Sequence, residues 1–226
     1  MNMKRSLVAA LLVCVAALAI AQENDRELFR EAERRFESGD YALALDRYET
    51  LIQTYPVSQY VPDSQYRIAI ALYRTGNPEE ALEQLARVAR RYRSTRYVGF
   101  VPFWQGVITY ELGRYDEAAR ALREFQDGEV TDEESLSQSY YYLALAALGR
   151  ADEEAARGAL DEMISLAEDP TDEGYALTLL LSFYAKAGLS EELLALTAEL
   201  EPSRLEERWR PHLVLYEAEA YYKMGE

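Results

Sequence analysis

The sequence predicts an all-α protein, a solenoid of helix–turn–helix repeats, and three observations support this fold class. Glycines that follow an apolar helical stretch recur at intervals of 36 to 39 residues. The apolar residues on either side of each glycine follow the period of a helix face, and no strand-like alternation interrupts them. A fixed period of this length indicates a repeat architecture. The six glycines are Gly39, Gly76, Gly113, Gly149, Gly188 and Gly225.

The first 21 residues are expected to be a secretory signal peptide. A basic amino terminus precedes 15 apolar, uncharged residues, and Ala19 and Ala21 supply the small residues that a signal peptidase reads. An uncleaved anchor is the alternative, but a membrane span needs about 20 apolar residues. Cys14 follows Val13, where lipoprotein processing requires a small residue. We therefore expect export and cleavage after Ala21, without a lipid anchor and without a membrane span in the mature chain.

Each repeat is expected to contain two helices joined by its glycine, which supplies the left-handed residue that ends the first helix. The second helix opens with acidic residues that favour its dipole, as at Glu79 and Glu80, and Pro78 fits a first helical position. One such pair cannot bury its own apolar face, so neighbouring pairs must stack. The solenoid is expected over 22–226, with units at about 24–58, 59–95, 96–130, 131–170 and 171–203 and a partial sixth at 204–226.

Two later units depart from the pattern of the first three. The fourth has one extra residue before Ala155, and the fifth has Leu193 where alanine is expected. The sixth would lack its second helix, which would leave helix 210–224 half-covered. This predicts that the gene continues past Glu226; a terminal capping helix is the alternative.

Composition limits the chemistry that the chain can perform. Its 24 Lys and Arg and 40 Asp and Glu give a net charge of −16, which disfavours non-specific binding of nucleic acid or an anionic membrane. One Cys and one His exclude a disulfide framework, Cys/His zinc sites and a thiol–imidazole pair. No phosphate-binding or hydrolase motif is present. We therefore expect no catalytic residues, no cofactor and no metal, although paired carboxylates of a glycosidase remain compatible with the composition.

The turn sequences identify the family that the chain resembles. They are Gly-Asp-Tyr-Ala-Leu-Ala at 39–44, Gly-Asn-Pro-Glu-Glu-Ala at 76–81 and Gly-Arg-Tyr-Asp-Glu-Ala at 113–118. Together with the small residues seven positions before each glycine, they resemble the tetratricopeptide repeat (TPR) family. The resemblance implies a right-handed α-solenoid that binds proteins, with the first helix of each pair on its concave side. The small residues are Ala32, Ala69 and Gly106.

A second resemblance is narrower and rests on the junctions between units. Tyr-Pro-Val-Ser-Gln-Tyr at 55–60 and Tyr-Arg-Ser-Thr-Arg-Tyr at 92–97 are similar to a bacterial envelope subgroup of the family. That subgroup includes the lipoprotein of the outer-membrane assembly machinery and a periplasmic protein associated with Tol-Pal. The resemblance implies a non-catalytic periplasmic or secreted scaffold, peripheral to the outer membrane, that binds another envelope protein or itself. A sensor or substrate-presenting domain of a larger envelope enzyme or transport system is the alternative.

Six aromatic residues in the first helices are candidate partner-binding residues. One set lies ten positions before the turn glycine and the other three before it, so the two share one helix face. They are expected either to grip a peptide or to pack against neighbouring helices, as aromatics at helical spacing commonly do. The first set is Phe29, Tyr66 and Phe103, and the second is Phe36, Tyr73 and Tyr110.

Charge divides the chain into two parts. Residues 22–113 carry 12 basic and 14 acidic residues, whereas residues 114–226 carry 10 and 26. The first part contains Arg87, Arg90 and Arg91, followed by Arg93 and Arg96 with no acid between them. This cluster is expected either to dock an acidic partner or to complement the carboxyl end of a helix. We expect the protein-binding surface in units one to three.

Overall fold

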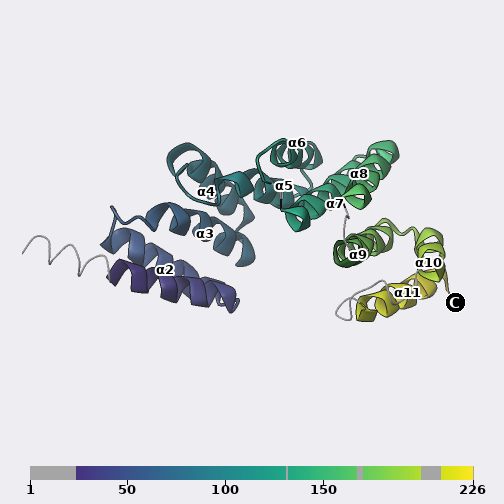
Figure 1. The fold of residues 1–226 in the computed structure, drawn as a ribbon, viewed down its shortest axis with the longest axis horizontal. Coiled ribbons are helices and arrows are strands. Elements are labelled where there is room, and N and C mark those ends of the chain that lie inside the picture. Colours follow the sequence, from purple (N-terminus) through teal and green to yellow (C-terminus); the bar gives the residue numbers. More distant parts are fainter. Residues whose placement is uncertain (1–23, 131, 167–169, 200–209, 226) are drawn as a thin grey trace, which may run out of the picture. The chain divides into compact units, whose positions relative to one another are not determined.

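The computed structural model describes residues 24–130, 132–166, 170–199 and 210–225, and it is helical without a strand in these ranges. This confirms the predicted all-α repeat fold. Figure 1 shows the helices in chain order. The chain divides into two compact units at Val101 and Pro102, called unit 1 and unit 2 below, and the single helix pairs are called repeats. The expected signal peptide lies outside the described residues.

Unit 1 contains two helix pairs. Residues 24–37 are helical and pair with α2 (Tyr41–Thr54), and α3 (Val61–Arg74) pairs with α4 (Pro78–Arg91), which a short 3-10 turn (Val98–Phe100) follows. The α3 helix packs against both α2 and α4. The core of the first pair is built from residues of both its helices and the start of α3, namely Phe29, Ala32, Ala44, Tyr48, Leu51, Val61 and Ile68.

The described residues of unit 2 form three further pairs and a last helix. The pairs are α5 (Val101–Glu111) with α6 (Tyr115–Gln126), α7 (Glu133–Gly149) with α8 (Glu153–Ser165), and α9 (Pro170–Ala187) with α10 (Ser190–Glu199). The last helix, α11 (Arg210–Met224), packs against α9 and α10. It buries Leu213 and Ala220 but exposes Val214, Leu215 and Tyr222.

The turns correct one prediction for repeat four, namely that Gly149 ends its first helix as the turn residue. Five turn glycines have φ between +72° and +84°, but Gly149 does not, and Ala151 with φ of +57° takes its place. Ala151 and the next residue donate the same two backbone hydrogen bonds that close the other turns, here to Leu148 and Ala147. The extra residue therefore lies before the turn, and Ala156 rather than Ala155 takes the buried alanine position.

Close helix approach explains the small residues. Ala32, Ala69, Ala44, Ala81 and Ala118 are completely buried. A Cβ atom at Gly106 would lie 2.5 Å from Cγ of Leu122, so only glycine fits there.

Gly149 has the same role in place of the predicted turn. A Cβ atom there would lie 2.6 Å from the ring of Tyr115. The glycine thus lets the end of α7 meet the start of α6.

Candidate protein-binding surfaces

The aromatics ten positions before the turn are core residues. Phe29, Tyr66 and Phe103 are 7%, 4% and 5% exposed. In unit 1 each stacks on the last tyrosine of a junction motif: Phe29 on Tyr60 at 4.8 Å between ring centroids, and Tyr66 on Tyr97 at 4.7 Å. These three side chains therefore pack within the repeats. Of the six aromatic candidates, Phe36, Tyr73 and Tyr110 remain as candidate contacts for a partner.

The junction motif has a structural role that sequence reasoning treated only as a family mark. In each junction of unit 1 the backbone N–H of the last tyrosine donates a hydrogen bond to the hydroxyl two residues before it. Tyr60 donates to Ser58, and Tyr97 donates to Thr95, both at 3.2 Å. The Thr95 hydroxyl also donates to Asp63 at 2.6 Å. The motif thus fixes the connecting loop, and with it the ring that covers the first helix.

The aromatics three positions before the turn are only half-buried. Phe36 lies 4.6 Å beneath the guanidinium of Arg67, and Tyr73 lies 5.4 Å from that of Arg74. Tyr110, in unit 2, has the rings of Tyr115 and Tyr142 at 5.9 and 5.6 Å. Their partly accessible faces satisfy the first requirement for contact with a partner.

Arg67 is the centre of a polar cluster in unit 1 that the sequence did not predict. Its Nε and Nη2 donate to the two carboxylate oxygens of Glu33 at 3.0 and 3.1 Å, and Nη2 also donates to the Tyr97 hydroxyl at 2.9 Å. The guanidinium carbon of Arg67 also lies 4.7 Å from the centroid of the Tyr97 ring. Tyr48 donates a further hydrogen bond to Glu33. The two parallel hydrogen bonds between Arg67 and Glu33 hold the first helix of repeat one against the first helix of repeat two.

The protonation states of this cluster follow from burial and charge. Burial lowers the pKa of the Arg67 guanidinium, but Glu33, Tyr97 and Tyr48 together outweigh burial and raise that pKa. Burial, together with the hydrogen bond to Glu33, raises the pKa of Tyr48 far above its ordinary value. The arginine therefore stays charged and the tyrosine stays neutral, which is the combination that both contacts require.

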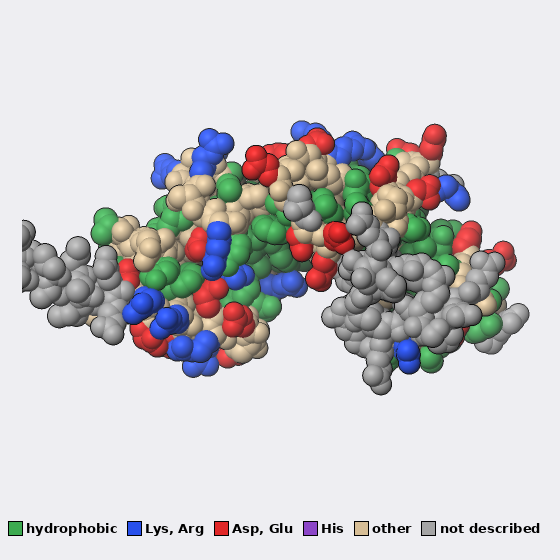
Figure 2. All heavy atoms as spheres, in the orientation of Figure 1, with side chains coloured by type: hydrophobic (Ala, Val, Ile, Leu, Met, Phe, Trp, Pro, Cys, Tyr) green, Lys and Arg blue, Asp and Glu red, His purple; other side chains and the backbone are tan. Residues whose placement is uncertain are grey.

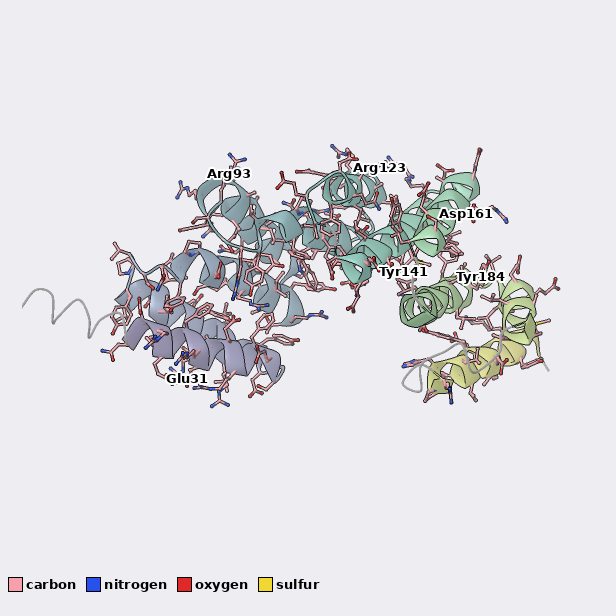
Figure 3. The ribbon with its side chains drawn as sticks, in the orientation of Figure 1. Glu31, Arg93, Arg123, Tyr141, Asp161 and Tyr184 are labelled. Carbon is pink, nitrogen blue, oxygen red and sulfur yellow. The ribbon has the colours of Figure 1, made fainter. Side chains whose placement is uncertain are left out.

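A second aromatic cluster lies in unit 2, on the first helices of repeats three to five. Tyr110 contacts Tyr142, which contacts Tyr141, and the exposed Lys186 on α9 lies 5.4 Å from the Tyr141 ring (Figure 3). The Tyr141 hydroxyl hydrogen-bonds Ser182 at 2.9 Å. Burial raises the pKa of Tyr110, and Lys186 opposes that shift. Tyr141 is buried, whereas Tyr110 and Tyr142 are partly accessible beside the charge of Lys186.

The predicted arginines lie exposed on the second helix of repeat two. Arg87, Arg90 and Arg91 are on α4, and the structure gives them no ion pair with any residue that it describes. Arg96 instead pairs with Asp63 at 3.2 Å. Basic side chains project from α4 in Figure 2, and Arg93 is labelled at the same end in Figure 3. These guanidinium groups are available to a partner.

Clusters of metal ligands and membrane-spanning helices are both missing from the described residues. Within the described ranges, no three or more His, Cys, Asp and Glu side chains gather as metal ligands would. Among the helices that the structure describes, none is long and apolar enough to cross a bilayer.

Solved structures resemble the chain in fold. A tetratricopeptide repeat protein from Parabacteroides merdae ATCC 43184 has a TM-score of 0.61 and 15% identity, over 90% of this chain and 74% of that one. MamA from Desulfovibrio magneticus RS-1 has a TM-score of 0.54 and 18% identity, over 76% and 95%. These likenesses show a TPR solenoid.

Sequence comparisons point to the bacterial outer membrane. Outer membrane protein assembly factor BamD of Pasteurella multocida (strain Pm70) is 22% identical over 104 residues, which are 46% of this chain and 40% of the relative. The matched part thus spans two fifths of that protein. A family model described as an outer membrane lipoprotein, YfiO, matches residues 21–140, more than half of the chain. The chain belongs to this YfiO family of outer membrane lipoproteins.

Proposed function

We propose that the protein is a non-catalytic periplasmic scaffold that binds another envelope protein during outer-membrane assembly. The observation that carries the proposal is the half-buried aromatic side chains held on rigid first helices. Aromatic anchors bury a large area with few rotatable bonds, which makes them effective contact residues. The family and the printed name of the Pasteurella relative support the pathway.

The proposed contact residues are the partly accessible ones. In unit 1 they are Phe36 and Tyr73, with the exposed arginines of α4 as the charged part of the surface. In unit 2 the corresponding residue is Tyr110. The arginines favour a partner with acidic groups, because complementary charge speeds association.

A photocrosslinking experiment tests the binding surface in the cell. A photoreactive phenylalanine analogue at position 73 or 110 should crosslink to a defined envelope protein, and the same analogue at the exposed Glu83 should not. With the crosslinked protein purified, Tyr73→Ala and Tyr110→Ala should each weaken binding by about 1–3 kcal/mol. Arg90→Glu with Arg91→Glu should mainly slow association. Folded tyrosine variants that bind as tightly as the parent would refute this surface.

Signal-peptide cleavage and lipid attachment are tested separately, by the intact mass of the protein. The cleavage signals in residues 1–21 lead us to propose a mature chain that begins at Gln22, without the lipid that the family description names. Intact-mass measurement of protein purified from the cell envelope should give that start. A lipid adduct on Cys14, or the full-length mass, would show that the chain is anchored instead.

A further inference from the structure

A solvent-open hollow in unit 2 lies between repeats four and five and does not involve the residues of the proposed surface. Its volume is about 180 Å³, and the ends of α7 and α9 and the starts of α8 and α10 surround it. Leu148, Leu160, Phe183 and Leu189 give it apolar walls. Pockets for small molecules usually measure about 300–1,000 Å³, so this one suits a single large side chain better than a whole ligand.

The fifth repeat differs from the others at the point where its two helices meet. The earlier repeats place a buried alanine there, as at Ala118 and Ala156, but the fifth places Leu193, which is 1% exposed and belongs to the core with Leu181 and Ala185. A leucine needs more room than an alanine, so α10 cannot approach α9 as closely. Leu189, which directly precedes α10, is one of the residues that line the hollow.

Charged side chains surround the hollow. One acid and one base, Glu192 and Arg157, line it. A second acid, Asp161, lies nearby on α8, across from Tyr184 on α9 (Figure 3). Burial raises the pKa of the Tyr184 hydroxyl, Arg157 lowers it, and Glu192 and Asp161 raise it, so these charges act on one place. All three charged side chains are exposed, and the described part of the chain offers them no ion pair.

We propose that this hollow docks a segment of a partner protein that inserts one leucine- or phenylalanine-sized side chain flanked by Lys or Arg. The apolar walls would bury the inserted side chain, and Asp161 and Glu192 would face its basic neighbours. The wider surroundings favour the same partner, because residues 114–226 carry 26 acidic and 10 basic residues. An acidic segment, in contrast, would be repelled. The site is independent of the surface proposed above.

A defined peptide tests the chemistry of the site. Fluorescein-labelled Gly-Lys-Lys-Phe-Lys-Lys-Gly is titrated with the full chain at physiological salt, and its binding is followed by anisotropy. We expect saturable binding that weakens about tenfold or more when alanine replaces the phenylalanine, because the hydrophobic contribution of that side chain is lost. Equal binding of the two peptides would overturn the proposal, as would no binding.

Matched variants locate the peptide. Asp161→Lys with Glu192→Lys should weaken binding about tenfold beyond the control Glu117→Lys with Glu124→Lys, which changes net charge equally from exposed sites on α6. Leu189→Trp should block the hollow. Thermal melts verify that each variant is folded. If Leu189→Trp is unfolded, the comparison of the two pairs of charge reversals decides whether the peptide binds at the hollow. Equal losses in both charge pairs would mean a non-specific acidic field and would overturn the site.

Two outcomes separate this proposal from its competitors. Tyr73→Ala and Tyr110→Ala should leave peptide binding unchanged, so failure of the function proposed above would not affect this test. Sedimentation of the chain alone tests whether a second copy of the protein occupies the hollow instead. Self-association that Leu189→Trp abolishes would mean that a second copy fills the hollow, which would overturn the basic-segment proposal.

Discussion

In unit 1 the repeats are joined by a charged pair and stacked rings, whereas in unit 2 they are joined by hydroxyl groups, edge-to-face rings and close backbone approach. Arg67 and Glu33 connect the first helices of repeats one and two, and both side chains are at most 20% exposed. In unit 2 the hydroxyl of Ser139 accepts a hydrogen bond from Gln126 at 3.1 Å, and Gly149 meets Tyr115. The same repeat backbone thus accepts different chemistry between its units.

The difference extends to the surfaces. Unit 1 uses one arginine internally and leaves several others exposed on α4, while the later residues carry most of the acidic excess. Phe103 in repeat three contacts Trp104 and Phe125, and no junction tyrosine among the described residues stacks on it as Tyr60 and Tyr97 do in repeats one and two. The two units therefore differ in charge: unit 1 is close to neutral and has an exposed arginine cluster on α4, whereas the residues from 114 onward are strongly acidic.

The largest expected effect tests whether the two units unfold separately. Leu85 in α4 and Leu122 in α6 occupy the same repeat position and are completely buried. Leu85→Gly should lower the free energy of unfolding by about 4 kcal/mol, from cavity formation and loss of helix propensity. Hydrogen exchange should show the loss in residues 24–101, and Leu122→Gly should show it in unit 2. Equal loss in both units from either change would contradict the division, and Glu83→Gly should cost only about 1 kcal/mol.

The charged centre of unit 1 is expected to come next. The Glu33 side chain is only 16% exposed in the intact protein, and Arg67→Ala removes its ion pair. This change should lower the free energy of unfolding by about 3 kcal/mol. Arg96→Ala is the control, because Arg96 is 62% exposed in its pair with Asp63 and should contribute about 1 kcal/mol or less. Urea denaturation measures both. Similar values for the two variants would show that the Arg67 centre does not hold the repeats together.

A smaller effect is expected where α7 meets α6 in unit 2. Gly149→Ala places a methyl group against the Tyr115 ring and should lower the free energy of unfolding by about 1–3 kcal/mol. Gly158→Ala is the matched control, because a Cβ atom there meets nothing within 4 Å, and it should raise stability by about 0.5–1 kcal/mol through helix propensity. Thermal melts would compare them. A stabilising Gly149→Ala would disprove the close-approach explanation.

The smallest effect tests the corrected register of repeat four. Ala151 has a left-handed backbone, which costs an alanine free energy that glycine avoids. Ala151→Gly should raise the free energy of unfolding by about 0.5 kcal/mol, since the added freedom of the unfolded chain offsets part of the gain. Gly113→Ala, at the equivalent turn, should lower it by about 1 kcal/mol. Chemical denaturation resolves the opposite signs, and a loss on Ala151→Gly would contradict the register.

The sequence by itself determined the features that local chemistry controls. Helical periodicity, acidic first turns and the turn sequences at 39–44, 76–81 and 113–118 predicted the helix pairs, because each depends on residues within one or two turns of chain. The small residues at 32, 69 and 106 likewise identified the close helix contacts. The repeat period then predicted how the pairs stack, since every pair has the same apolar face to bury.

Only the tertiary structure decided which of several equivalent roles a residue takes. A glycine at the repeat period can form a turn or admit a neighbour, and Gly149 admits Tyr115 while Ala151 makes the turn. Aromatics seven residues apart share a helix face, yet Phe29 is covered by the junction tyrosine and Phe36 is left half-buried. Arg67 meets Glu33 across 34 residues of chain. Such outcomes depend on what the neighbouring repeat places opposite each side chain, and no local pattern contains that information.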